Sequence, residues 1–214
     1  MLVLEEVYKS KKAENSEQFN LRIHRGLSWL KKAVILQSDL DLKFLSLWIA
    51  LSAINPQPVK THNGEQDFSQ FFGSLVRLDR EQKIQHIVWD RYRDAITRLI
   101  ESPYTFQNFW DDQNQKINQK VWKQAFLAEK KHVSEARQAQ DSICLLGIVF
   151  QRLLTLQHQI ILGGATYNSS MNRKLLQDGC NIMIAVIPAC MHIILENPQN
   201  FDFDTPFYPL LQVS

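Results

Sequence analysis

Side chains able to do chemistry gather near the end of the most apolar part of the chain, at Arg152, Gln157 and His158. A histidine with a pKa near neutrality can accept or donate a proton, and an arginine can hold a phosphate with paired hydrogen bonds. Polar side chains at the end of a buried helix can point into a cleft. We therefore expect any chemistry of this chain to lie there.

A helix over residues 141–162 must position these side chains. Asp141 or Ser142 can cap its first turn. Gly163 and Gly164 follow its last turn, where glycine adopts the left-handed conformation at little cost. The apolar residues at helical spacing between these signals are Leu146, Val149, Phe150, Leu153, Leu154, Ile160 and Ile161. The pattern predicts one buried helix with a sharp stop.

The remaining sequence predicts an all-α fold. Only 7 Gly and 7 Pro interrupt 214 residues, and no alternating apolar run of strand length occurs. A chain of this length fits one domain, residues 1–214. We expect an irregular start, a loop over 59–66, a mobile connection over 111–120 and an extended tail over 197–214 that docks on the core. The other helices expected are 16–37, 42–54, 68–78, 79–101, 121–139 and 171–196, the last kinked at Pro188.

Composition favours a cytoplasmic protein without a cofactor. The formal net charge of +2 is spread along the chain, which favours a polyanionic partner only mildly. Cys144, Cys180 and Cys190 lie among apolar neighbours without metal-ligand spacing, so we expect buried reduced thiols and no metal site. We expect no secretion, because Glu5 and Glu6 follow the first four residues, and no membrane span, because the apolar segment 182–195 is short.

Two stretches carry a specific resemblance. Residues 163–173 read Gly-Gly-Ala-Thr-Tyr-Asn-Ser-Ser-Met-Asn-Arg and precede a proline-containing helix. Residues 19–33, with the later Asp39 and Leu-Trp at 47–48, form the second stretch. Together they resemble the HEPN (higher eukaryotes and prokaryotes nucleotide-binding) superfamily in its small, stand-alone bacterial form.

The resemblance implies a helical bundle that usually dimerises. The superfamily includes metal-independent endoribonucleases of toxin–antitoxin, phage-defence and CRISPR systems. In that group the helix end carries an arginine, a polar residue, three further residues and a histidine, and the arginine and histidine would meet near the dimer axis. The histidine can move the proton of the 2′-hydroxyl or the leaving group, and the arginine can hold the scissile phosphate.

The present chain departs from this pattern at both catalytic positions. Gln157 stands at the arginine position and Leu162 at the histidine position, while the intermediate polar residue is His158. Glutamine brings no charge to a phosphate, and leucine can neither give nor take a proton. The catalytic pair of the superfamily therefore cannot be carried over to this chain.

A shifted pair, Arg152 and His158, is the alternative catalytic site. Six residues on a continuous helix turn about 600°, which leaves the two side chains about 120° apart. They would not converge within one protomer but could do so across a dimer. A deliberate substitution at positions 157 and 162, or an offset in the match to the superfamily, would also explain the departure from the pattern.

Further candidate binding residues have ordinary structural explanations as well. Arg25, beside His24, could line an RNA groove or a solvated helix face. Asn168 and Ser169 could contact phosphate at a helix N-terminus, or only cap that helix, and Arg173 follows them. His192 and the tryptophans fit core positions better than a site. The spacing of Tyr167 does not match the modifiable tyrosine of some superfamily members.

Three functional hypotheses follow. The first is a non-catalytic homodimer that binds RNA or a protein, such as a cognate antitoxin or an active paralogue. The second is an active metal-independent endoribonuclease toxin that uses Arg152 and His158 or further residues. The third is a structural helical interaction module.

Overall fold

The computed structural model describes residues 2–55, 68–201 and 208, and every regular element within them is helical. The predicted all-α class is thereby confirmed. The α-helices are α1 (Leu2–Lys11), α2 (Glu17–Ile35), α3 (Leu40–Ile54), α4 (Ser69–Leu78), α5 (Lys83–His86), α6 (Arg93–Glu101), α7 (Gln107–Gln113), α8 (Gln119–Gln138), α9 (Ser142–Ile161) and α10 (Arg173–Glu196). A π-helical segment covers Ile87–Arg91, and 3-10 turns cover Lys12–Glu14, Pro103–Thr105 and Pro198–Asn200.

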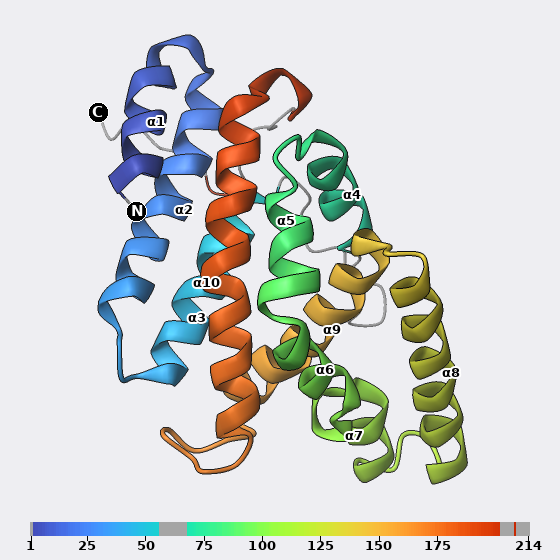
Figure 1. Ribbon diagram of the computed structural model, residues 1–214. Helices are drawn as coiled ribbons and strands as arrows, with labels where there is room; N and C mark the ends of the chain where they lie inside the picture. Colours follow the sequence, from blue (N-terminus) through green and yellow to red (C-terminus); the bar gives the residue numbers. More distant parts are fainter. Residues whose placement is uncertain (1, 56–67, 202–207, 209–214) are drawn as a thin grey trace.

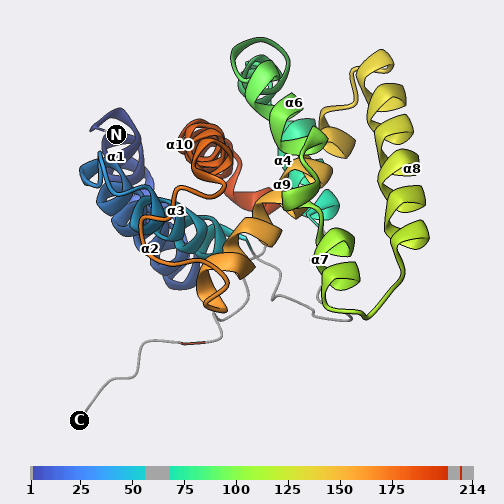
Figure 2. The same cartoon turned by 90° about the horizontal axis from the view of Figure 1, so that it is seen from below.

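Helix α10 is the centre of the bundle. Figures 1 and 2 show it between α1, α2 and α3 on one side and α4, α6 and α9 on the other. It packs on both α3 and α6, and its buried side chains include Ile182, Val186 and Ile194. It continues as one helix through Pro188, whose missing N–H removes a single backbone bond.

Close helix packing depends on glycine at two positions. A Cβ at Gly26 in α2 would lie 2.6 Å from Met191 Cε and 2.8 Å from Ile54 Cγ2. A Cβ at Gly179 in α10 would lie 2.8 Å from Leu153 Cδ2. These two positions let α2 approach α3 and α10, and let α10 approach α9.

The helix signals around the candidate site are confirmed. Asp141 caps α9 by accepting hydrogen bonds from the backbone N–H groups of Ile143 and Cys144, both at 3.0 Å. Gly163 has a φ of +72° directly after the helix end. Ser16 and Asp39 cap α2 and α3 in the same way, as their positions in the sequence predict.

Three predictions of local structure were wrong. The chain starts with helix α1, because Leu4 and Tyr8 lie one turn apart and are both buried. The helix expected over 79–101 is divided into α5, the π-helical segment and α6, with Gln82 at a φ of +53° before α5. The connection expected over 111–120 is shorter than predicted, since α7 ends at Gln113 and α8 begins at Gln119.

Most of the predicted tail, and the loop expected over 59–66, fall outside the described residues. The tail is described up to Phe201, which is buried, and again at Tyr208, which is exposed. The docking of an extended tail therefore stays a prediction.

Two helices, α9 and α10, are long and apolar enough to cross a membrane by length and composition. We expected the apolar segment 182–195 to be too short to span a membrane, but it belongs to the longer helix α10, which has the necessary length. Within the structure, 50% of the most apolar window of α9 and 72% of that of α10 are buried. Core helices of water-soluble proteins meet the same criterion, so this finding is weak support for a membrane location.

Candidate functional site

The two motif positions lie at the exposed end of α9. Gln157 is half-buried in the penultimate turn, and Leu162 follows the helix as its C-cap residue. The Leu162 side chain is 78% exposed, and its backbone N–H donates to the His158 carbonyl at 2.9 Å. A histidine at this place would reach solvent, whereas leucine offers only apolar surface.

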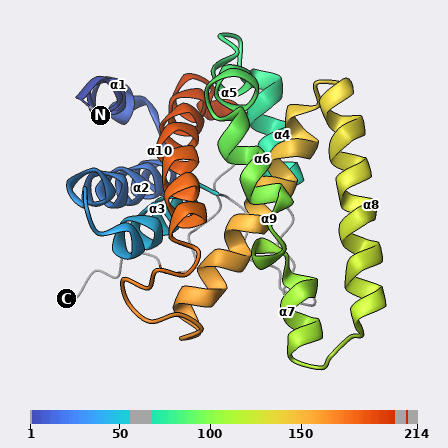
Figure 3. The same ribbon diagram turned by 60° about the horizontal axis from the view of Figure 1, so that its bottom comes forward.

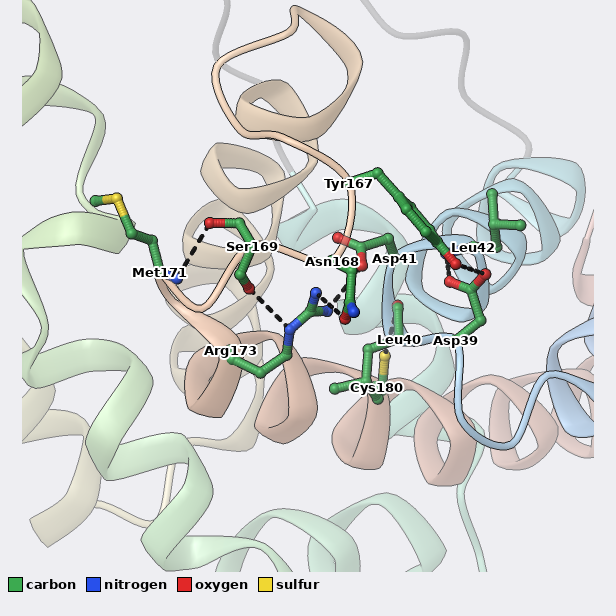
Figure 4. A network of polar contacts seen from close by, with 10 residues as sticks. All are labelled: Asp39, Leu40, Asp41, Leu42, Tyr167, Asn168, Ser169, Met171, Arg173 and Cys180. Atoms are coloured by element: carbon green, nitrogen blue, oxygen red, sulfur yellow. Dashed lines mark hydrogen bonds and ion pairs between the residues drawn. The ribbon is translucent and has the colours of Figure 1, made fainter.

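Arg173 holds the loop between α9 and α10 in place (Figure 4). Its Nη1 lies 2.8 Å from Asp41 Oδ2, its Nη2 donates to Asn168 Oδ1 at 3.0 Å, and its Nε donates to the Ser169 carbonyl at 3.0 Å. Three of the predicted ligand-binding residues are thus brought together, but their polar groups bind one another. Their arrangement stabilises the loop against α3.

The predicted capping of α10 by residues 168–170 was wrong. The N-cap is Asn172, which has a φ of +56° and makes no side-chain cap bond. Its Nδ2 instead donates to Gln159 Oε1 at 3.0 Å. The Ser169 hydroxyl accepts from the backbone N–H of Met171 at 3.2 Å, within the loop. The start of α10 therefore lacks the serine cap that the phosphate-binding hypothesis assumed.

Exposed apolar side chains surround this loop. Tyr167 lies beside Leu42 of α3, with its hydroxyl donating to Asp39 Oδ2 at 2.8 Å (Figure 4). Hydrogen bonding to the Asp39 carboxylate raises the pKa of Tyr167. We call the following exposed residues the apolar loop surface: Leu42, Ile161, Leu162, Tyr167 and Met171.

Arg152 lies inside the bundle, toward α8. Its side chain is almost fully buried, and its Nη2 donates to the Glu129 carboxylate. The guanidinium carbon lies 4.4 Å from the ring centroid of Phe106 and 5.2 Å from that of Phe126. Burial lowers the pKa of Arg152, and the charge of Glu129 opposes that shift. Arg152 is therefore held by an ion pair and two aromatic rings.

His158 and Arg152 line the same open cavity of about 570 Å³, which lies between α7, α8 and α9. The cavity spans two turns of α9, so both side chains line it although they point in different directions around the helix. Their divergence within one protomer stays a prediction. Burial lowers the pKa of His158, which favours its neutral imidazole. Among the described residues, no hydrogen bond or ion pair involves its ring.

The chain matches no family model, no curated protein and no solved structure. The remaining candidate side chains lie on α2 and α8.

Arg25 lies apart from both the Arg173 contacts and the Arg152 cavity. It is half-buried on α2, and its Nη2 donates to the Tyr208 carbonyl at 2.8 Å. Its neighbour His24 is exposed.

Helix α8 carries a cationic face that was not among the predicted binding residues. It lies at the edge of the bundle, in contact with α7 and α9 (Figure 3). Lys120, Lys123 and Lys130 are exposed along it, and within the described residues none of them pairs with a carboxylate. Their helical spacing was visible in the sequence, but the even distribution of charge along the whole chain concealed it.

The thiols also differ from expectation. Burial raises the pKa of Cys180 to about 12 and also raises the pKa of Cys190, as expected for core thiols. Cys144, however, is only half-buried, and its Sγ lies 3.0 Å from His132 Nε2. Its first-turn position on α9 explains the exposure. Within the described part of the chain, no group of three or more His, Cys, Asp or Glu side chains could hold a metal ion.

Some residues expected in the core are buried, and others lie at the surface. Trp48 is buried, while Trp29 is exposed at the surface of α2. His192 is half-buried, with Lys83 Nζ 3.3 Å from its Nε2 and a Glu196 carboxylate oxygen 3.3 Å from its Nδ1.

Proposed function

We propose that this protein is a non-catalytic protein of the HEPN type that acts by binding, as a homodimer formed through the apolar loop surface. The observation that carries the proposal is Leu162, an exposed leucine at the end of α9 where the superfamily places its histidine. An exposed leucine is unfavourable in water and favourable in a protein interface.

The side chains present argue against catalysis. Gln157 has no charge for a scissile phosphate, and Leu162 has no proton to transfer. The alternative catalytic pair, Arg152 and His158, is also poorly suited to cleave RNA. Arg152 is buried, and its charge is already balanced by Glu129. A guanidinium in this position would have to leave its ion pair to reach an RNA phosphate.

The apolar loop surface supports self-association. Its five residues come from α3, the end of α9 and the loop that Arg173 orders. Exposed apolar side chains on neighbouring elements are candidates for a protein interaction site. In the superfamily that the sequence resembles, this helix end lies near the dimer axis, so a second copy of the chain is the partner we propose.

Light scattering coupled to size exclusion tests this proposal. At about 100 µM, well above a micromolar dissociation constant, we expect the mass of a dimer. Leu162→Asp should give a monomer, because it places a charge in the interface. Leu127→Asp is the matched control, since Leu127 is also an exposed leucine but lies on α8. A monomeric wild-type protein, or a dimer that survives Leu162→Asp, would contradict the proposal.

RNA binding is a second candidate function, favoured by the cationic face of α8. Lys120, Lys123 and Lys130 have charges that no carboxylate within the described residues neutralises. Lysines that neutralise phosphates release counterions, so RNA affinity should fall steeply with salt.

A triple lysine-to-glutamine variant at positions 120, 123 and 130 should weaken RNA binding. The slope of the logarithm of affinity against the logarithm of salt concentration should become less steep by up to about three units. The same substitutions at Lys9, Lys12 and Lys32, which are exposed on the N-terminal helices, provide a control of equal charge. Equal losses in both variants would assign binding to net charge rather than to α8.

A further inference from the structure

Two arginines, Arg93 and Arg137, line a second open pocket that shares no residue with the Arg152 cavity. Its volume is about 260 Å³, and it lies where the π-helical segment and α6 meet the end of α8 and the start of α9. Trp89, Gln140 and Asp90 contribute to the same wall. Within the described residues, neither arginine forms an ion pair with a carboxylate.

Both guanidinium groups keep donors that a ligand can reach. Arg93 is exposed, and in the described part of the chain its side chain makes no hydrogen bond. Arg137 is half-buried and uses Nη2, which donates to Thr97 Oγ1 at 2.6 Å. Its Nε and Nη1 have no partner in that part of the chain, and neither is closed off from solvent. An oxyanion can therefore accept hydrogen bonds from both side chains without breaking an ion pair.

The polar groups of the pocket are held in position by the chain itself. The Thr97 hydroxyl donates to the Arg93 carbonyl at 2.8 Å while it accepts from Arg137, so it ties Arg137 to the turn of α6 that begins at Arg93. Trp89 Nε1 donates to Ser142 Oγ at 2.7 Å, which fixes the indole in the wall. Groups that are positioned before binding lose less entropy when a ligand arrives.

The backbone around the pocket is irregular. Trp89 and Asp90 belong to the π-helical segment, and Gln140 has a φ of +51°. π-helical turns are rare and occur frequently at functional sites, and a left-handed conformation is uncommon for a residue other than glycine. Both irregular segments supply side chains to the same pocket.

The charges of the wall favour an anion. The two arginines outnumber the one carboxylate, Asp90, whose Oδ2 already lies 2.8 Å from His86 Nδ1. The planar guanidinium matches the geometry of carboxylate and phosphate oxygens. Because the pocket is smaller than the roughly 300–1,000 Å³ typical of drug-sized ligands, it fits a small molecule.

We propose that this pocket binds a small ligand with one oxyanion group, a carboxylate or a phosphate, through Arg93 and Arg137. The oxyanion accepts hydrogen bonds from both guanidinium groups, the Gln140 amide donates another, and the remainder of the ligand lies against Trp89. The site depends neither on the proposed self-association nor on RNA binding by α8.

NMR of the ¹⁵N-labelled full-length protein tests the proposal through the indole N–H signal of Trp89, assigned with Trp89→Phe. The probes are benzoate, phenyl phosphate and inorganic phosphate, each compared with sodium chloride at equal ionic strength. We expect a saturable shift of this signal. Saturation with benzoate identifies a carboxylate ligand, and saturation with either phosphate probe identifies a phosphate ligand.

Arg93→Gln should weaken binding at least about tenfold, because it removes one of the two guanidinium groups. Arg93 is exposed, so the substitution should leave the thermal unfolding temperature unchanged. Arg91→Gln is the matched control, since Arg91 is also exposed, lies two residues away and is outside the pocket. It lowers the net charge by the same amount and should keep the affinity within about twofold.

The absence of a saturable shift at about 20 mM of every probe, a concentration that detects even millimolar affinity, would overturn the proposal. Equal weakening by Arg93→Gln and Arg91→Gln would also overturn it, because binding would then follow net charge alone. Light scattering on the same samples keeps these outcomes separate from the proposed dimer.

Discussion

Arg152 and Glu129 form an ion pair between α9 and α8, in a layer with the rings of Phe106 and Phe126. The two partners differ in their access to water: the Arg152 side chain is 2% exposed, whereas the Glu129 side chain is 25% exposed. Loss of one partner therefore has different consequences from loss of the other.

We expect Glu129→Gln to destabilise the protein by about 3 kcal/mol, because it leaves a buried guanidinium without a countercharge. Arg152→Met should cost less, since Glu129 can be solvated, and adding it to Glu129→Gln should restore part of the lost stability. Urea unfolding of the single and double variants measures these differences. Additive losses would show that the two charges do not interact.

Gly179 should be intolerant of a larger side chain. A Cβ there would lie 2.8 Å from Leu153 Cδ2 and 3.1 Å from Phe44 Cε2, so Gly179→Ala should cost about 1–3 kcal/mol despite the better helix propensity of alanine. Gly73→Ala in α4 is the control, because its nearest neighbour would be 3.8 Å away. That variant should gain about 0.5–1 kcal/mol. Thermal unfolding tests whether the two changes have opposite signs.

His158 should make stability depend on pH. Its pKa is lowered in the folded protein by burial, so the unfolded chain binds the proton more readily. The contribution of His158 is fully present above the unfolded pKa of about 6.5 and is lost as pH falls through the folded pKa. We expect His158→Gln to flatten the decline in the free energy of unfolding between about pH 7 and 5. An unchanged pH profile would assign that decline to other groups.

Local signals predicted much of the fold. Asp39 and Asp141 cap their helices as expected, and Gly163 ends α9 in the left-handed region, because such contacts lie within a few residues of one another. The break before α5 was missed, because the Asp79 side chain binds the backbone N–H groups of Lys83 and Ile84 and so favours a turn over a continuous helix.

The candidate site was less predictable, since its contacts are distant in sequence. Arg152 was identified as a candidate, but its partner Glu129 lies on another helix, and Arg173 binds Asp41 across 132 residues. Both arginines are used for internal ion pairs, which spacing along a single helix does not indicate. The cavity forms only where α7, α8 and α9 pack together, and the sequence did not lead us to expect α7.

Whether the end of α9 has lost catalysis can be measured by cleavage of a labelled mixed RNA pool in EDTA, with the wild-type protein and a Gln157→Arg/Leu162→His variant side by side. We expect the wild-type protein to leave the RNA intact and the variant to cut it, because the exposed end of α9 regains a phosphate-binding charge and a proton-transfer group. Cleavage by the wild-type protein that is lost in Arg152→Ala or His158→Ala would refute a non-catalytic role and identify the shifted pair as an active site.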